Sequence, residues 1–383
     1  MVLAVRRGSS LRHTAQRFGV SLGTVQYWVG RAKGQRLGRV EFANRPSGTR
    51  RAANRTSISL ERRILSLRAK LKKSSALGHH GAIAIRQALL ADDGKAPCAR
   101  TIGRILLRNG ALDFRRRQRH PPPPRGWYLP TVAAGQAEID SIDTICDLSI
   151  KNGPTVTILN AMSLHGGLPA SWPEDKISSK TVEKHLLSHW RLFGLPHFAK
   201  FDNDVIFQGP HHWPNTFGRI TRLCLQLQVT PVFVPPREPG FQAEIEAFNG
   251  RWQRAVWQRF MHRDLEDLRN RTRLFLDAAR EHVAPRMATA PERRQFPEEF
   301  VLDYQRPLSG TVVFLRRSNA RGVVDCLGGK WPVDAAWVHR LVRIEVDLTV
   351  QELRFYRLRR REPGDQPLMK TVHYPVARKP FRG

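Results

Sequence analysis

The feature that most constrains this fold is a strand that stops at two prolines and leads into a carboxylate-bearing helix. Residues 232–250 hold a Val-Phe-Val run, two prolines and then a helical pattern that carries Glu246. Two more carboxylates, Asp140 and Asp202, each follow an apolar approach that is typical of a strand. Stability alone gives no reason to bring three like charges together. The pattern therefore predicts a metal site built from two strands and one helix.

The charge balance indicates a polyanionic partner. The 383 residues include 64 Lys and Arg against 33 Asp and Glu, which is a formal net charge of +31. Nucleic acid is the partner that most often offsets such an excess. The chain is also 41% hydrophobic and contains nine Trp, more ordered apolar sequence than is usual in a ribosomal or chromatin protein. Its length predicts two to four domains.

The sequence also indicates the cellular compartment of the protein. No apolar run reaches the roughly eighteen residues that a membrane span needs, and the apolar part of the N-terminus is too short for a signal peptide. The four cysteines are scattered without a Cys-x-x-Cys pair, which favours a reducing compartment and argues against structural zinc. We expect a cytoplasmic, nucleoid-associated protein with no membrane partner.

The N-terminal residues have helix-turn-helix spacing. Ala15 is small where two helices would cross, Gly19 can take the positive φ that ends a helix, and Ser21 can cap the next helix. We predict a DNA-binding domain over residues 1–35; the alternative is an ordinary helical hairpin. The side chains expected to face a major groove are those of Thr24, Gln26, Tyr27 and Arg31.

A second helical block follows a linker. Residues 36–56 are rich in Arg, Gly, Asn and Ser, and residues 57–114 then show apolar residues at helical spacing. Helices are expected over residues 59–73, 82–90 and 98–110. The exposed side of the third helix carries Arg100, Arg104 and Arg108. We predict a second DNA-binding helix-turn-helix. The alternative is a plain three-helix bundle, which would have almost the same sequence pattern.

A basic, proline-rich tether over residues 115–130 connects this block to the rest of the chain. Four consecutive prolines favour a stiff polyproline II segment. Because the tether would lie between two DNA-contacting parts, its cations are expected to contact phosphates. Those cations are Arg115, Arg116 and Arg117.

The remaining chain predicts two further domains. Residues 131–295 show three strands, a helix, a strand, a helix, a strand and a helix, which is the order of a ribonuclease-H-like α/β core. Residues 296–383 show short strands separated by turn residues, which predicts a small antiparallel β-barrel with a basic tail. The expected core strands are residues 136–143, 155–162, 167–172, 197–202 and 229–234.

Three short motifs stand in order in the central domain. They are Glu138-Ile139-Asp140, Phe201-Asp202-Asn203 and, after the proline turn, Ile245-Glu246-Ala247-Phe248-Asn249. They resemble the first-strand Asp, the Asp-Asn-Gly motif and the Val-Glu-Arg-Phe-Asn helix of the DDE transposase and retroviral integrase superfamily. The resemblance covers about residues 136–291. With its flanking domains the chain is similar to bacterial insertion-sequence transposases of Mu-like domain order.

The resemblance implies that Asp140, Asp202 and Glu246 are catalytic and bind two Mg²⁺ ions, for which Mn²⁺ can substitute. Phosphodiester attack needs charge neutralised on the attacking and the leaving oxygen, and two ions about 3.5–4 Å apart do this. Carboxylate oxygens are suitable Mg²⁺ ligands. Water would cleave the donor strand, and the freed 3′-hydroxyl would then attack target DNA.

Neighbouring carboxylates compete for these positions. Asp143 lies three residues beyond Asp140, on the opposite face of the expected strand. Asp204 stands where the family prefers Gly, and it either raises the pKa of a neighbour or points to solvent. Glu244 is about 200° round the helix from Glu246 and is expected to point outward. Further candidates for contact with the DNA backbone are Lys200, Asn249, Arg251 and Arg254.

These features lead us to expect a DNA transposase that binds the terminal repeats of its element through residues 9–110 and joins them to target DNA. Its partners would be double-stranded DNA, further copies of itself in a synapse and, as in some Mu-like relatives, an ATPase that selects the target. One alternative is a non-catalytic DNA-binding regulator, which would not need all three carboxylates. Another is a plain ribonuclease-H-type nuclease, which would not need two DNA-binding modules.

Overall fold

The computed structural model describes residues 1–43, 56–112, 123–209, 217–238, 240–375 and 381. The chain divides into two compact units, Met1–Glu61 and Arg62–Gly383. The phosphate contacts predicted for Arg115, Arg116 and Arg117 lie outside the described residues. In the part of the chain that is described, no helix is both long and apolar enough to cross a membrane.

The first unit is built from short helices, two of which have side-chain caps. They are α1 (Val2–Arg6), α2 (Leu11–Arg17), α3 (Leu22–Ala32) and the 3-10 helix η1 (Leu37–Arg39). Ser10 caps α2, and Ser21 caps α3 by accepting a hydrogen bond from the backbone N–H of Thr24 at 3.2 Å. Gly19 joins the two helices with φ +62°. The predicted cap and glycine turn are therefore confirmed, while DNA binding by this unit stays a prediction.

The second helical block also has the expected elements. It consists of α4 (Ile58–Ser74), α5 (Ala82–Asp93) and α6 (Ala99–Arg108). Gly94 ends α5 in the left-handed conformation that favours glycine, with φ +66°. Ile64, Ile85 and Ile102 are fully buried, one from each helix. A helix-turn-helix function for this block is not established by the helices alone.

A nine-stranded mixed sheet forms the centre of the larger unit, which confirms the predicted α/β class. Five of its strands have the order β3-β2-β1-β4-β5, with β1, β2 and β3 antiparallel and with β4 and β5 parallel to β1. Along the chain these strands and their helices follow the predicted succession of three strands, then helix, strand, helix, strand and helix, with the short α9 (Val205–Gln208) as an addition. Their bounds are β1 (Ile139–Ser149), β2 (Thr155–Ser163), β3 (Pro169–Glu174), β4 (Phe198–Phe201) and β5 (Thr230–Phe233).

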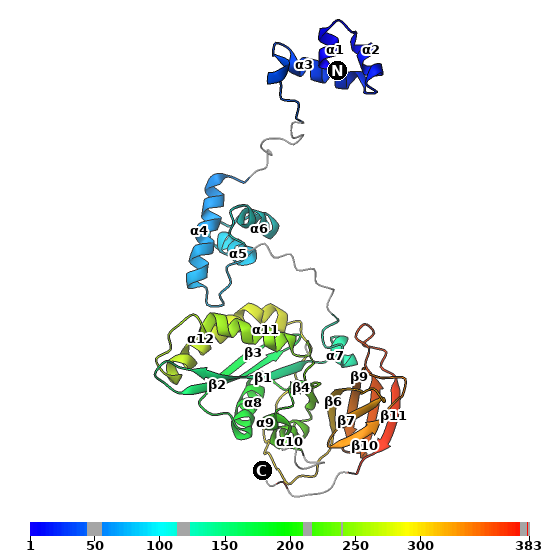
Figure 1. The fold of residues 1–383 in the computed structure, drawn as a ribbon. Helices are drawn as coiled ribbons and strands as arrows, with labels where there is room; N and C mark the ends of the chain where they lie inside the picture. Colours follow the sequence, from blue (N-terminus) through cyan, green and yellow to red (C-terminus); the bar gives the residue numbers. More distant parts are fainter. Residues whose placement is uncertain (44–55, 113–122, 210–216, 239, 376–380, 382–383) are drawn as a thin grey trace. The chain divides into compact units, whose positions relative to one another are not determined.

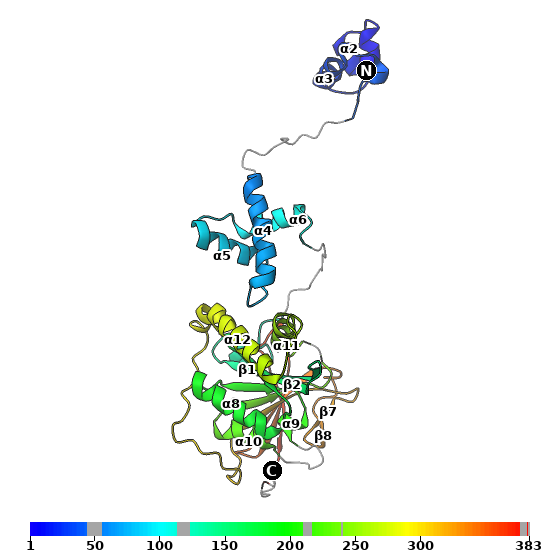
Figure 2. The ribbon, with the colours of Figure 1, turned by 90° about the vertical axis from the view of Figure 1, so that its left-hand side faces the viewer.

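Helices cover both faces of these five strands (Figures 1 and 2). On one face α8 (Ser179–Phe193) and α10 (Arg219–Gln226) pack against residues such as Ile142 and Leu159. On the other, α11 (Ala243–Trp252) and α12 (Leu265–Met287) pack against residues such as Ile158 and Met162. Alternation along each strand thus assigns every side chain to the α8 face or to the α11 face. Short helical turns complete the unit: α7 (Pro130–Ala133), α9 (Val205–Gln208) and η2 (Gln253–Trp257).

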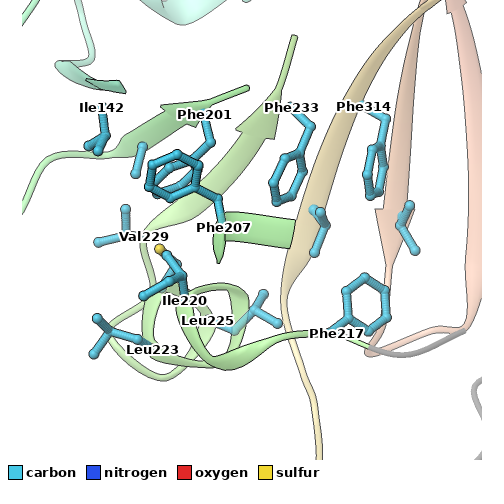
Figure 3. Close-up of a cluster of buried hydrophobic side chains, with 14 of the residues drawn as sticks. Ile142, Phe201, Phe207, Phe217, Ile220, Leu223, Leu225, Val229, Phe233 and Phe314 are labelled. Carbon is cyan, nitrogen blue, oxygen red and sulfur yellow. The ribbon is translucent and has the colours of Figure 1, made fainter. Parts of the chain in front are cut away.

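The C-terminal strands do not form the separate small barrel that the sequence predicts. Four of them extend the central sheet in the order β5-β6-β9-β10-β11. The junction is the parallel pairing of β5 with β6, where Phe233 stands opposite Phe314. Figure 3 shows these two rings side by side, with centroids 5.1 Å apart and planes 19° apart. The bounds are β6 (Thr311–Arg317), β9 (Leu341–Asp347), β10 (Glu352–Arg357) and β11 (Leu368–His373), and β7 (Val323–Cys326) pairs only with β8 (Gly329–Pro332).

The physical reason for this difference is that the two halves share one core. Phe201, Ile220 and Phe233 from the central part belong to the same buried cluster as Phe314 and Ile344 from the C-terminal part. Val232 and Phe233 of β5 are buried in two different apolar clusters, and pairing with β6 satisfies the backbone groups that an edge strand would leave unpaired. A pairing between residues so far apart in the sequence leaves no local sequence signal.

Phe314→Ala should therefore destabilise the whole larger unit, not only its C-terminal strands. Phe314 is fully buried at the junction, and removing such a ring costs about 3–5 kcal/mol of unfolding free energy. Urea unfolding followed by tryptophan fluorescence would measure this loss. Val301→Ala is the matched control, because Val301 is 83% exposed and should change stability very little. A loss below about 1 kcal/mol for Phe314→Ala would contradict the shared core.

Candidate active site

The pairing of β1 with β4 decides which carboxylate of β1 stands beside Asp202. Their parallel register places Ser141 opposite Lys200. Asp143 and Asp202 each follow this last pair by two residues, so the same register brings them towards each other, and the charge of Asp202 acts on Asp143. Residues two apart on a strand share a face. Asp143 and Asp202 therefore lie on the α11 face of the sheet, together with Ser141 and Lys200.

Asp140 lies on the opposite face, and its predicted role as a metal ligand needs correction. Its two carboxylate oxygens accept hydrogen bonds from the guanidinium of Arg293, at 2.8 Å each, and Trp190 Nε1 donates to Oδ2 at 3.0 Å. The side chain is almost fully buried. Burial opposes its charge, but Arg293 outweighs burial and lowers the pKa of Asp140. Both oxygens are thus committed to a buried ion pair.

Asp140 was predicted as a ligand because the sequence places the end of this strand too early. The sequence predicts a strand that ends at Asp143, with Asp140 near its end. The observed β1 runs from Ile139 to Ser149, so Asp140 is its second residue and Asp143 lies in its middle. The predicted alternation is confirmed, because Asp140 contacts Trp190 of α8 on one face and Asp143 contacts Asn249 of α11 on the other. The sequence near Asp140 does not reveal that this carboxylate forms an ion pair, because Arg293 is 153 positions away.

Asp143 occupies a half-buried position beneath α11. Asn249 Nδ2 donates to Asp143 Oδ2 at 2.8 Å, and Asn160 Nδ2 donates to Asn249 Oδ1 at 2.8 Å. Burial raises the pKa of Asp143 to about 6, and the negative charges of Asp202 and Glu246 add to this rise. Asp202 and Glu246 are therefore near enough to act electrostatically on Asp143. Because the amide of Asn249 is hydrogen-bonded to both Asp143 and Asn160, it holds the Asp143 carboxylate in place, and contact of Asn249 with DNA stays a prediction.

Asp202 lies at the start of the loop that follows β4. Burial raises its pKa, and the charge of Asp204 adds to this effect. The backbone N–H of Asp204 donates to Asp202 Oδ1 at 3.0 Å. Asp204 in turn caps α9, because its Oδ1 accepts a hydrogen bond from the N–H of Ile206 at 2.8 Å. The departure from Gly at this position thus has a structural role in capping.

The C-terminal strands brace the same loop. Asn203 Nδ2 donates to the carbonyl oxygen of Val234 at 2.7 Å, and Arg316 Nη2 of β6 donates to Asn203 Oδ1 at 2.9 Å. Arg316 also donates to the carbonyl of Val234 at 3.1 Å. The residue that follows Asp202 is therefore held by β5 and β6 together, a contribution from the C-terminal part that sequence reasoning missed.

The first turn of α11 carries two carboxylates with different surroundings. Ile245 and Phe248 are buried and fix the inward face of the helix. Glu246 is exposed beside them. Glu244 does not point outward as predicted, because Ser141 Oγ donates to its Oε1 at 2.9 Å and the ammonium of Lys200 pairs with the same oxygen. Lys200 is fully buried, so its predicted contact with DNA is wrong.

The other predicted DNA-contacting residues differ in accessibility. Gln26 and Tyr27 are exposed on α3, whereas the Thr24 hydroxyl is hydrogen-bonded to Ser21 at 2.8 Å. The Arg31 guanidinium lies 5.2 Å from the centre of the Trp28 ring and donates to the carbonyl of Ala43 at 2.8 Å. The exposed residues elsewhere are Arg100, Arg104 and Arg108 on α6 and Arg254 in η2, and Arg251 is half-buried. DNA contact by these residues stays a prediction.

A divalent cation fits the α11 face chemically. Among the described residues no three His, Cys, Asp or Glu side chains already converge closely enough to hold a metal ion. Mg²⁺ does not require such a cage, since it keeps several waters and is bound through one or two carboxylates. The pKa of Asp143 is raised first by burial and then by the charges of Asp202 and Glu246, and a bound cation would favour its ionised form. Asp143, Asp202 and Glu246 are the residues that fit this need.

Comparison of the sequence with protein-family models and with curated proteins gives no match. Similar solved structures include a chain of the simian T-cell lymphotropic virus intasome in complex with PP2A regulatory subunit B56 gamma (14% identity over 73% of this chain and 91% of that chain, TM-score 0.35). The catalytic core domain of BIV integrase shares 18% identity over 36% of this chain and 80% of that chain, with a TM-score of 0.27. The HTLV-2 integrase catalytic core domain in complex with magnesium, in its dimeric form, shares 15% identity over 41% and 87%, also with a TM-score of 0.27. At such scores the likeness carries no argument, and the fold assignment rests on the strand order.

The two carboxylates of β1 should respond to substitution with opposite signs. Asp140→Ala should lower the free energy of unfolding by about 3–5 kcal/mol, because it leaves the guanidinium of Arg293 buried without a partner. Asp143→Asn should raise this free energy at pH 7 without metal, by up to about 3 kcal/mol, because the raised pKa of Asp143 means that the folded state disfavours its charge. Denaturant unfolding in EDTA measures both changes.

The pH dependence provides the control for Asp143. The pKa of Asp143 in the folded chain, about 6, lies above its ordinary value of 3.8. As the pH falls from 6 to 4, wild-type Asp143 takes up a proton on folding, so the advantage of Asp143→Asn should shrink and then vanish. A loss of stability in Asp143→Asn at pH 7, or a gain that does not depend on pH, would contradict this arrangement.

Proposed function

We propose that this protein is a DNA transposase of the integrase type, a polynucleotidyl transferase that cuts DNA strands and joins the resulting 3′ ends to target DNA. The observation that carries the proposal is the grouping of Asp143, Asp202 and Glu246 on one face of a ribonuclease-H-like sheet. The formal charge of +31 supports a nucleic acid substrate. A structural role alone gives no reason to group two half-buried carboxylates with a third, exposed one.

Each group has a distinct task in this proposal. Asp143 and Asp202 hold the metal from the two central strands, and Glu246 completes the site from α11. Asn249 keeps the Asp143 carboxylate in one orientation through its 2.8 Å hydrogen bond. Bound Mg²⁺, or Mn²⁺ in its place, would neutralise charge on the attacking and leaving oxygens of the phosphodiester. The nucleophile is water in strand cleavage and the freed 3′-hydroxyl in strand transfer.

DNA binding is assigned to the basic surfaces outside the carboxylate site. Arg100, Arg104 and Arg108 lie exposed along one helix, and Arg254 lies exposed close to the candidate site in sequence. Such cations contact phosphates and position the duplex without reading its sequence. Recognition of terminal repeats by the N-terminal helices, assembly of several copies on DNA and a separate ATPase that selects the target belong to the same proposal.

A strand-transfer assay tests this function. Purified protein, labelled duplexes taken from the DNA that flanks its coding sequence, a target plasmid and Mg²⁺ should produce joined strands. Asp143→Asn, Asp202→Asn and Glu246→Gln should each lower product formation by about a thousandfold, because metal stabilisation of the transition state amounts to several kcal/mol. Asp147→Asn is the matched control, since Asp147 is exposed on the same strand and its φ of +60° suits Asn.

Two outcomes would contradict the proposal. Specific binding to the flanking duplexes without cleavage, in either Mg²⁺ or Mn²⁺, would favour the non-catalytic DNA-binding regulator. Joined product that persists in Asp143→Asn would show that Asp143 is not part of the catalytic site.

A further inference from the structure

A buried lysine lies directly behind the candidate site. The Lys200 side chain is fully buried, which is rare for lysine unless it is paired. Its ammonium has three N–H groups, and each has a partner: Tyr128 Oη at 2.9 Å, the carbonyl oxygen of Phe241 at 2.5 Å, and the Glu244 carboxylate. Ser141 Oγ donates to the same carboxylate at 2.9 Å. A single ammonium thus connects β4 to the start of α11, and Glu244 connects α11 to β1.

The members of this network precede the proposed ligands by two residues in all three elements. The pairs are Ser141 and Asp143 on β1, Lys200 and Asp202 at the end of β4, and Glu244 and Glu246 on α11. On a strand, residues two apart share a face and lie next to each other along it. On a helix they are about 200° apart, so a Glu244 held against the sheet fixes the rotation of the helix that carries Glu246.

We propose that the Lys200–Glu244 ion pair, with the Ser141 hydroxyl on the same carboxylate, positions Asp143, Asp202 and Glu246 for divalent-cation binding. Lys200, Glu244 and Ser141 are positioning groups, since none of these three is proposed to touch substrate or metal. The inference rests on the proposed function. It adds that the α11 side of the site is set by a buried ion pair and not by apolar packing alone.

Stability alone does not account for this network. The desolvation of two buried charges roughly cancels their attraction, and a well-packed apolar pair is often at least as stable. A fully satisfied polar network does provide a single arrangement, because each hydrogen bond has a preferred direction. Metal ligands need such support, and loss of their outer partners typically lowers metal affinity about 10–100-fold.

The test measures binding of Mn²⁺ to the full chain by the electron paramagnetic resonance signal of the free ion, in the absence of DNA. The main variant is the double substitution Lys200→Met with Glu244→Gln, which removes both charges and keeps the side-chain volumes. We expect its Mn²⁺ dissociation constant to rise about 10–100-fold. Ile344→Val is the matched control, because Ile344 is equally buried but lies in the C-terminal strands and should leave Mn²⁺ binding unchanged.

Two milder variants keep the test decisive if the double variant does not fold. Ser141→Ala removes one hydrogen bond to Glu244, and Tyr128→Phe removes only the hydroxyl that accepts from Lys200. Each should raise the Mn²⁺ dissociation constant by about fivefold, the value of one hydrogen bond. Circular dichroism confirms that each variant is folded. A conservative Lys200→Arg variant should bind Mn²⁺ more tightly than the double variant, because it keeps both charges of the ion pair.

The possible results separate this inference from the proposed function. A folded double variant that binds Mn²⁺ within about twofold of the wild type would overturn the positioning role while leaving the proposed function intact. If the double variant is unfolded, unchanged binding in both mild variants overturns the inference. Wild-type protein that binds no Mn²⁺, or binds it as well after Asp143→Asn, would refute the metal site itself and the inference with it.

Discussion

The parallel pairing of β1 with β4 is the constraint on which the candidate site depends. A shift of this register by one residue would exchange the two faces of the sheet. In the observed register, Asp143 comes beside Asp202 on the face that α11 covers. Asp140, three residues earlier, is buried on the other face with Arg293. One strand therefore carries a structural carboxylate and a candidate metal ligand, distinguished only by the side on which each lies.

Local structure was readable from the sequence because it depends on local chemistry. The cap at Ser21, the turn at Gly19 and the succession of core elements follow from residue type and spacing. The errors concern choices made by distant partners. Asp140 was assigned to the site because nothing near it reveals Arg293, and a separate barrel was expected because nothing near β5 reveals its pairing with β6.

The electrostatics of the two sheet faces are opposite. Around Asp140 a guanidinium compensates the buried charge and lowers its pKa, so the ionised form is stable there. Around Asp143 burial and two further carboxylates raise the pKa to about 6, and its side-chain hydrogen bond among the described residues comes from the neutral amide of Asn249. Lys200 neutralises Glu244 instead. Asp140 and Glu244 are thus each paired with a cation of the chain, whereas the proposed ligand Asp143 has no such partner in the part of the chain that the structure describes. A carboxylate without a cationic partner is a suitable ligand for a bound metal ion.

The most direct measurement of the central claim is an anomalous-diffraction map from crystals soaked in Mn²⁺, because manganese is located independently of the protein atoms. We predict an anomalous peak within bonding distance of carboxylate oxygens of both Asp143 and Asp202, on the α11 face of the sheet. A peak ligated by Asp140, or a map without a peak on that face at millimolar Mn²⁺, would contradict this prediction.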